Sequence, residues 1–323
     1  MTRSILTILT NGLTFSLAMS MAGTGSSLAQ TYPSKPVRIL TAEAGGAFDI
    51  AARTFTRPVS EGLGQRVIID NRPSILIPNL IKSAPADGYT VCYLGTSFLM
   101  APILGEATYN PSTEFSPVTL LNLSHQVLAV NRSLPVASVK ELIAMAKAQP
   151  GALNYAKGRD GSGGHLASEL FISMAAINMV AIPFKGGGPA IASVLAGQTQ
   201  VIFANSPEVA EYFKSGRLKL LGVSTPKATP LAPGLKPISD DLPGFEASSG
   251  AMMFAPPQTP VPVIQRLNQE MVRYAKSTEG REGMLKLGLD PVGSTSEELS
   301  VYVKYQTTKW TKVIEDGKVG GAR

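Results

Sequence analysis

The chain has 323 residues, of which 44% are hydrophobic and 16% are charged, and its formal net charge is +6. This length accommodates about two domains of ordinary size. The lone cysteine, Cys92, has no partner for a disulfide, and the basic residues are spread along the chain instead of forming a dense cluster. The composition therefore excludes a disulfide-stabilised scaffold and does not favour nucleic-acid binding.

Residues 1–29 are predicted to form a secretory signal peptide. Arg3 supplies the positive charge at its start, a mostly apolar run follows at 5–21, and Ser27-Leu28-Ala29 matches a small-x-small cleavage site. The apolar run is short and interrupted by polar residues, which disfavours an uncleaved membrane anchor. We therefore expect cleavage near Ala29 and an exported mature protein.

The mature chain begins with a strand, a turn of small residues and a helix. Residues 37–41 are mostly apolar and predict a buried strand, and the helix begins near Phe48 and Asp49. The amide groups of such a turn and the start of a helix can bind an anion, although an ordinary strand-to-helix connection has the same pattern. Asp49 either caps the helix or accepts a hydrogen bond from a ligand. The candidate ligand-binding residues are Ala44, Gly45, Gly46, Ala47, Phe48 and Asp49.

Two further strands are predicted at 66–70 and 90–95, whereas residues 74–81 show no clear pattern. Strands that alternate with helices indicate parallel pairing, and such sheets bind ligands beyond the carboxyl ends of their strands. Thr96 and Ser97 follow the third strand directly, so we expect them at the same edge as the first turn.

The chain is predicted to cross between two lobes twice. Short strand-like runs at 117–121 and 127–130 flank a polar stretch at 122–125, where we place the first crossing, and the return lies at 247–251. Lobe 1 then comprises residues 30–124 and 249–323, and lobe 2 comprises residues 125–248. Capping boxes and apolar periodicity predict helices at 138–147 and from 295 past 310, and apolar spacing predicts one at 264–274.

Lobe 2 is expected to repeat the strand, turn and helix design. Strands are predicted at 153–156, 180–183 and 200–204, and a glycine-rich or polar turn follows each one. The cations of these turns can anchor an anion or stay solvated, and the histidine can donate to a carboxylate or only cap or pack its helix. The candidate ligand-binding residues are Lys157, Arg159, Gly161, Ser162, Gly163, His165, Lys185, Gly186 and Asn205.

Catalytic and metal chemistry find little support in the sequence. The loop at 160–164 lacks the residue order of a serine-protease nucleophile, and no Gly-x-Ser-x-Gly elbow occurs. Two isolated histidines and one cysteine have no metal-ligand spacing, and no P-loop is present. We therefore expect a binding protein without a cofactor or metal, not an enzyme.

Short motifs in a fixed order connect the chain to a known family. They are YPSKP (32–36), AGG with Asp49 (44–49), DNRP (70–73), ADGYT (86–90), SVKEL (138–142), HLASEL (165–170), PFKG (183–186), PGFE (243–246) and PVGS (291–294). In this order they resemble the solute-binding receptors of tripartite tricarboxylate transporters, the Bug family, over nearly the whole mature chain.

The resemblance implies a two-lobed periplasmic binding protein of type II, a Venus flytrap in which each lobe is a mixed sheet flanked by helices. It further implies a small organic acid as ligand, membrane subunits of a transporter as partners, and a monomer. Two alternatives remain open: a receptor that presents its ligand to a membrane sensor, and a binder of a neutral or aromatic molecule.

The first site loop departs from the family pattern. Thr41, Ala42 and Phe48 stand where the family commonly has Pro, Phe and Thr, and Glu43 adds a negative charge. Residues 74–77 replace a glycine-rich stretch. Lys157 and Arg159 stand where small uncharged residues are usual, so our hypothesis places the anchor of the anion mainly on lobe 2.

Overall fold

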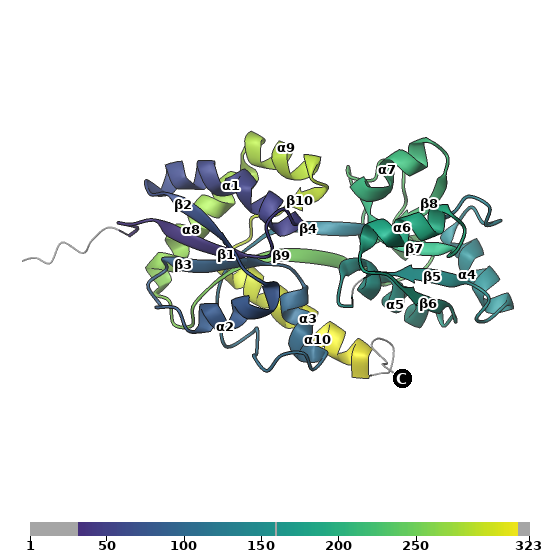
Figure 1. Cartoon of the computed structure of the whole chain (residues 1–323), viewed down its shortest axis with the longest axis horizontal. Coiled ribbons are helices and arrows are strands. Elements are labelled where there is room, and N and C mark those ends of the chain that lie inside the picture. Colours follow the sequence, from purple (N-terminus) through teal and green to yellow (C-terminus); the bar gives the residue numbers. More distant parts are fainter. Residues whose placement is uncertain (1–31, 159, 316–323) are drawn as a thin grey trace, which may run out of the picture.

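The computed structural model describes residues 32–158 and 160–315, so the predicted signal peptide and Arg159 lie outside the described residues. The described elements form two bodies, lobe 1 and lobe 2, which the strands β4 (Ser116–Asn131) and β9 (Ser248–Ala255) join (Figure 1). Each lobe has a mixed sheet with helices on its faces, which confirms the predicted fold class. Within the described chain, no helix combines the length and the apolar character that a membrane crossing needs.

Lobe 1 contains the first and last parts of the described chain. Its elements are β1 (Val37–Thr41), α1 (Ala47–Leu63), β2 (Val67–Asn71), the 3-10 turn η1 (Ser74–Leu76), α2 (Ile77–Lys82), β3 (Thr90–Leu94), α3 (Ser97–Ile103), α8 (Val261–Lys276), α9 (Thr278–Lys286), β10 (Leu289–Pro291) and α10 (Ser296–Glu315). The unassigned stretch at 74–81 is thus η1 with most of α2, and Ser97 begins a helix instead of lying in a turn.

Lobe 2 is built from the middle of the chain. Its elements are α4 (Val139–Ala148), β5 (Asn154–Lys157), α5 (Gly163–Ala175), β6 (Val180–Pro183), α6 (Gly187–Leu195), β7 (Val201–Asn205), α7 (Ser206–Lys214), β8 (Leu218–Val223) and the 3-10 turn η2 (Ile238–Asp240). Ser138 accepts a hydrogen bond from the amide of Glu141, so the predicted cap of α4 is present.

The two sheets share one strand. The strand order is β2-β1-β3-β9-β4-β7-β5-β6, with β10 and β8 also paired to β4. Strands β1, β2 and β3 pair in parallel, whereas β9 runs antiparallel to both β3 and β4. All five residues of β3 are buried, as a central strand covered on both faces requires.

The prediction of two short strands around a polar crossing was wrong, because β4 is a single strand of 16 residues. Its polar residues remain in the ladder: Ser124 and His125 pair with Ser249 and Ser248 of β9. The side chain of Asn122 donates to the hydroxyl of Tyr93 at 2.8 Å. Hydrogen bonds made by tertiary neighbours thus satisfy polar groups that resembled a loop in the sequence.

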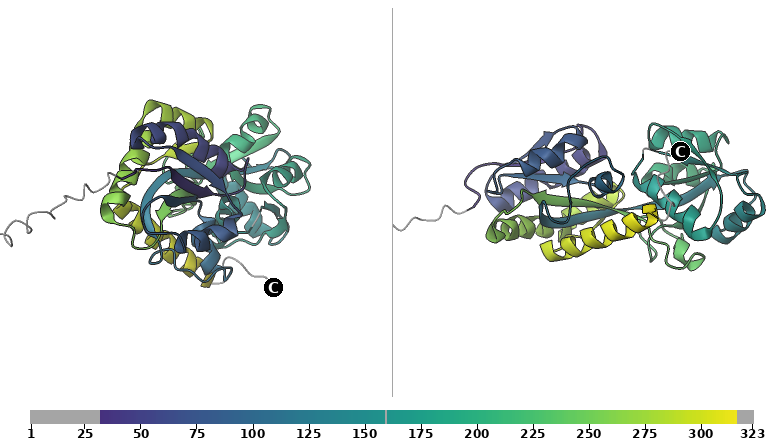
Figure 2. Two further views of the ribbon diagram at one scale, coloured as in Figure 1. Left: turned by 60° about the vertical axis from the view of Figure 1, so that its left-hand side comes forward. Right: turned by 90° about the horizontal axis from the view of Figure 1, so that it is seen from below.

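Helix α10 reaches from lobe 1 to lobe 2. Near its start Leu299 and Val303 join an apolar cluster of lobe 1, whereas Trp310, 2% exposed, joins a cluster of lobe 2 that includes Phe171 and Phe245. Figure 2 shows the helix running lengthwise under lobe 1 toward the junction. Besides β4 and β9, α10 therefore contacts both lobes.

Candidate functional site

A cavity of about 800 Å³ lies between the two lobes, and residues of both lobes line it. The helices α1, α5, α6 and α7 all begin at its wall, as does the shorter α3. The start of a helix presents amide groups without helical partners and the positive end of the helix dipole. These helix starts therefore favour negative charge on a ligand, whereas four acidic residues that also line the cavity oppose it: Glu43, Glu106, Asp160 and Glu208.

The first turn is held by Asp49, which is only 3% exposed. Its carboxylate accepts from the amide of Gly45 at 2.8 Å and from the side chain of Asn71 at 3.0 Å, and it pairs with Arg53 at 2.8 Å. The hydrogen bond from Arg53, followed by the one from Gly45, lowers the pKa of Asp49 to about 2. Asp49 thus supports the turn from inside and does not line the cavity.

The glycines of the first turn do not line the cavity either. The backbone of Gly45 has a φ of 76°, which glycine adopts without strain, and the amide of Gly46 donates to the carbonyl of Glu43 at 3.1 Å. Of the six predicted residues here, Ala47 and Phe48 line the cavity. The Phe48 ring lies over Gly95, whose added Cβ would come within 2.2 Å of it.

His165 holds the corresponding turn of lobe 2. Its Nδ1 accepts from the amide of Gly161 at 3.1 Å, its own amide donates to Ser162 at 3.4 Å, and its side chain is buried. Burial, and then the charge of Lys157, lowers the pKa of His165 to about 4. The imidazole is therefore neutral at pH 7, with Nδ1 as acceptor, and it positions the turn from behind the cavity wall.

The glycines at the start of α5 allow a close approach of backbone segments. A Cβ on Gly163 would lie 2.5 Å from the Ser249 hydroxyl, and a Cβ on Gly164 would lie 2.5 Å from the Phe203 carbonyl oxygen. Only glycine fits at these positions without movement of the neighbours. This brings the start of α5 against β7 and β9 at the cavity wall.

The predicted cations lie behind or beside the wall. Lys157 pairs with Asp160 at 2.6 Å, and neither Lys157 nor Lys185 lines the cavity, whereas Gly186 and Asn205 do. The predicted residues that line it are Ala47, Phe48, Thr96, Ser97, Gly161, Ser162, Gly163, Gly186 and Asn205. Those that do not are Ala44, Gly45, Gly46, Asp49, Lys157, His165 and Lys185, and Arg159 lies outside the described residues.

Several lining residues escaped the sequence analysis. Gln126 donates to the Asn205 side chain at 2.9 Å, and Asn205 donates to Glu208 at 3.1 Å, which forms a polar row on the lobe 2 wall. Glu106 lines the wall on the lobe 1 side, as does Glu43, whose negative charge the sequence analysis noted without including it among the ligand-binding residues. Two features of the sequence could have identified site residues: Glu208 lies in the first turn of α7, and a polar stretch precedes Gln126. No sequence feature pointed to Glu106.

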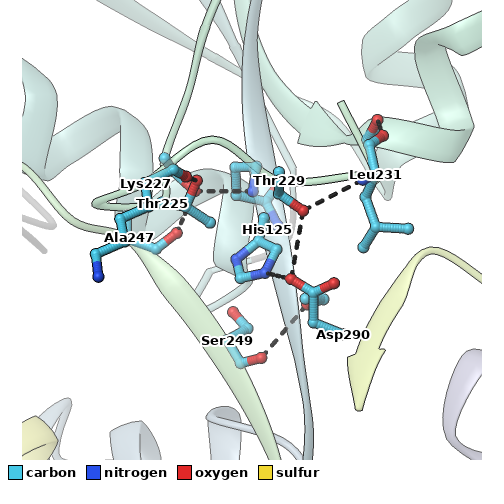
Figure 3. Close-up of polar contacts among 12 residues, drawn as sticks. His125, Thr225, Lys227, Thr229, Leu231, Ala247, Ser249 and Asp290 are labelled. Carbon is cyan, nitrogen blue, oxygen red and sulfur yellow. Dashed lines mark hydrogen bonds and ion pairs between the residues drawn. The ribbon is translucent and has the colours of Figure 1, made fainter. Parts of the chain in front are cut away.

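A polar cluster lies beside β4 where its pairing changes from β9 to β7 (Figure 3). The imidazole Nε2 of His125 contacts the carboxylate of Asp290 in β10. The hydroxyl of Thr229, in the lobe 2 segment after β8, donates to the same carboxylate at 3.4 Å and accepts from the amide of Leu231. Asp290 thus connects lobe 1, the crossing strand and lobe 2.

Together these features define a class of protein: an α/β binding protein of the periplasmic type, with two lobes joined by crossing strands and a cavity between them. The family of tripartite tricarboxylate transporter receptors matches residues 51–319, and the chain belongs to this family. It is therefore a member of a family of solute-binding receptors, which agrees with the resemblance seen in the sequence.

Relatives and solved structures agree with this assignment. Protein BugT of Bordetella pertussis is 30% identical over 298 residues, which cover 89% of this chain and 91% of BugT. R. palustris Rpa4515, solved with adipate, is 30% identical with a TM-score of 0.72 and coverage of 88% and 97%. A TctC solute-binding protein from Polaromonas shares the fold, with 22% identity, a TM-score of 0.80 and coverage of 88% and 100%.

Proposed function

We propose that the protein captures a small carboxylate in the cleft between its lobes and delivers it to the membrane subunits of a tripartite tricarboxylate-type transporter. The observation that carries the proposal is the convergence of α1, α5, α6 and α7 on one cavity by their N-terminal ends. The adipate in the structure of R. palustris Rpa4515 supports a carboxylate as the ligand class.

Capture proceeds by closure of the lobes on the ligand. Lobe 1 (residues 30–124 and 249–323) and lobe 2 (residues 125–248) move as rigid bodies about β4 and β9. The protein acts as a monomer in the periplasm after removal of residues 1–29. The residues that contact the ligand are the predicted ones that line the cavity.

Thermal unfolding with a library of small carboxylic acids tests the binding step. A ligand present at about a hundred times its dissociation constant adds about 2.7 kcal/mol to the free energy of unfolding. X-ray scattering on the same samples is expected to show compaction at saturation. If none of the acids stabilises the protein, the proposal is wrong. For delivery, uptake of the identified acid is expected to require both this receptor and the transporter subunits.

Two neighbouring glycines provide a matched pair of variants. Gly187 lines the cavity, whereas Gly188 does not, and a Cβ added to Gly188 would meet open space. Gly187→Leu is expected to abolish binding of the identified acid, and Gly188→Leu to leave it within about twofold of the unmodified protein. Equal effects of the two substitutions would place the ligand elsewhere.

A further inference from the structure

We propose that the ligand of this receptor carries a single carboxylate at one end and an uncharged apolar body at the other. The carboxylate lies against lobe 2 and the body lies against lobe 1. This inference rests on the proposed function, because it names the kind of acid that the cleft selects. Three properties of the cavity wall support it: the number of helix starts on each lobe, the apolar surface and the distribution of charge.

More of the helix starts at the wall belong to lobe 2 than to lobe 1, where, among the described residues, α1 and the short α3 also begin without a side-chain hydrogen bond at the N-cap. On lobe 1 the amides of Gly45 and Gly46 are occupied by Asp49 and by the carbonyl of Glu43. On lobe 2 three helices begin at the wall, and within the described chain neither α6 nor α7 has a side-chain hydrogen bond at its N-cap. Gly186 and Gly187 add no side chain that would separate their amides from a carboxylate.

The wall on the lobe 1 side is largely apolar. The apolar residues that line it are Phe48, Ile75 of the turn η1, Pro78, Leu94 and Phe98. The side chain of Ile75 is 72% exposed although it is a large apolar group. An apolar ligand body against this wall, covered by lobe 2 on closure, removes apolar surface from water on both partners.

The same wall disfavours a second carboxylate. Glu43 and Glu106 line it without an ion pair among the described residues, whereas on the lobe 2 wall Asp160 pairs with Lys157 at 2.6 Å and Glu208 accepts from Asn205. Among the described lining residues of either lobe there is no lysine and no arginine. A distal carboxylate on the ligand would lose water and face charges of its own sign without a cation opposite it. A dicarboxylate therefore gains less from this wall than a monocarboxylate of the same length.

Hexanoate and adipate form the deciding pair, since both have six carbons and differ in the second carboxylate. Isothermal titration calorimetry on the mature protein is expected to give hexanoate at least about tenfold tighter binding than adipate. Benzoate and terephthalate repeat the comparison with a rigid body. Tighter or equal binding of the dicarboxylate in both pairs overturns the inference and leaves the proposed function intact. No binding by any of the four, together with a negative acid library, overturns both.

Substitutions at exposed positions test the wall itself without disturbing the core. Ile75→Ser is expected to weaken the preferred monocarboxylate about fivefold or more, whereas Leu80→Ser, on the exposed face of α2 and away from the cavity, leaves it unchanged. Equal effects of the two substitutions contradict the role of Ile75.

The charges are tested with a double substitution. Glu43→Gln with Glu106→Gln is expected to strengthen adipate several-fold, roughly in line with the loss of two like charges, and to change hexanoate by less than about twofold. Glu282→Gln, at an exposed position of α9 that does not line the cavity, is the control and is expected to change neither acid. Adipate affinity that stays the same in the double variant refutes selection by these carboxylates.

Discussion

Acidification is expected to destabilise lobe 2 through His165. In the folded protein its pKa is lowered from 6.5 to about 4, first because the ring is buried and second because Lys157 lies nearby. The unfolded chain therefore binds a proton between these two values while the folded chain does not, so stability falls as pH falls through this interval. The protonated ring would also present an N–H to the amide of Gly161, and their hydrogen bond would be lost.

The size of the effect follows from the two pKa values. Between about pH 7.5 and about pH 5 a single group with these values removes about 2 kcal/mol from the free energy of unfolding. Other groups titrate in the same range, but they are shared with the variant His165→Gln. The assay is urea unfolding followed by circular dichroism at both pH values for both proteins.

The unmodified protein is expected to lose about 2 kcal/mol more than His165→Gln on acidification. The chain has only two histidines, so nuclear magnetic resonance of the imidazole signals can also follow the titration of His165 directly. An equal loss in both proteins, or a His165 signal that titrates near its ordinary pKa, would refute the reasoning.

The remaining predictions concern the turns and the junction between the lobes. Gly164→Ala is expected to cost about 1–3 kcal/mol in urea unfolding because its Cβ would meet a backbone carbonyl, whereas Gly188→Ala, with open space, is neutral or stabilising. Asp49→Asn is expected to cost about 1–3 kcal/mol at neutral pH, and the difference should shrink as pH falls from about 4 through about 2, where the native carboxylate becomes protonated; a difference independent of pH would contradict the role of the charge. Asp290→Ala is expected to leave the secondary structure intact and to change the scattering profile of the ligand-free protein, because it removes the contacts of Asp290 with His125 and with Thr229 of lobe 2. Trp310 is the only tryptophan, so its fluorescence is expected to change when the lobes close; a signal that is unchanged while scattering shows compaction would mean that α10 does not report on the junction.

Much of the local structure follows from sequence patterns. The apolar spacing at Ile264, Leu267, Met271 and Tyr274 predicts α8, and all four side chains are buried in the folded protein. The pair Thr295 and Glu298 predicts the start of α10, and the two residues exchange hydrogen bonds there. These signals suffice because helix periodicity and capping depend on residues that are only three or four positions apart.

The crossing strand shows where local patterns fail. A polar stretch at 122–125 resembles a loop because its hydrogen-bonding partners are distant in the sequence. Tyr93 satisfies Asn122 across 29 positions, and Asp290 meets His125 across 165. Neither partner can be identified from the residues around β4.

The sequence by itself predicted two α/β lobes, each with turns of small residues after its strands. It also showed that the chain resembles a receptor family. The tertiary structure decided which turns offer free amides. Asp49 occupies the amide of Gly45, and His165 lies behind the turn of lobe 2 instead of facing the cavity. It also brought Glu43 and Glu106 to one wall although 63 positions separate them. The choice of ligand depends on such convergence in space, because a binding site sums the charge and apolar surface of residues that no local pattern links.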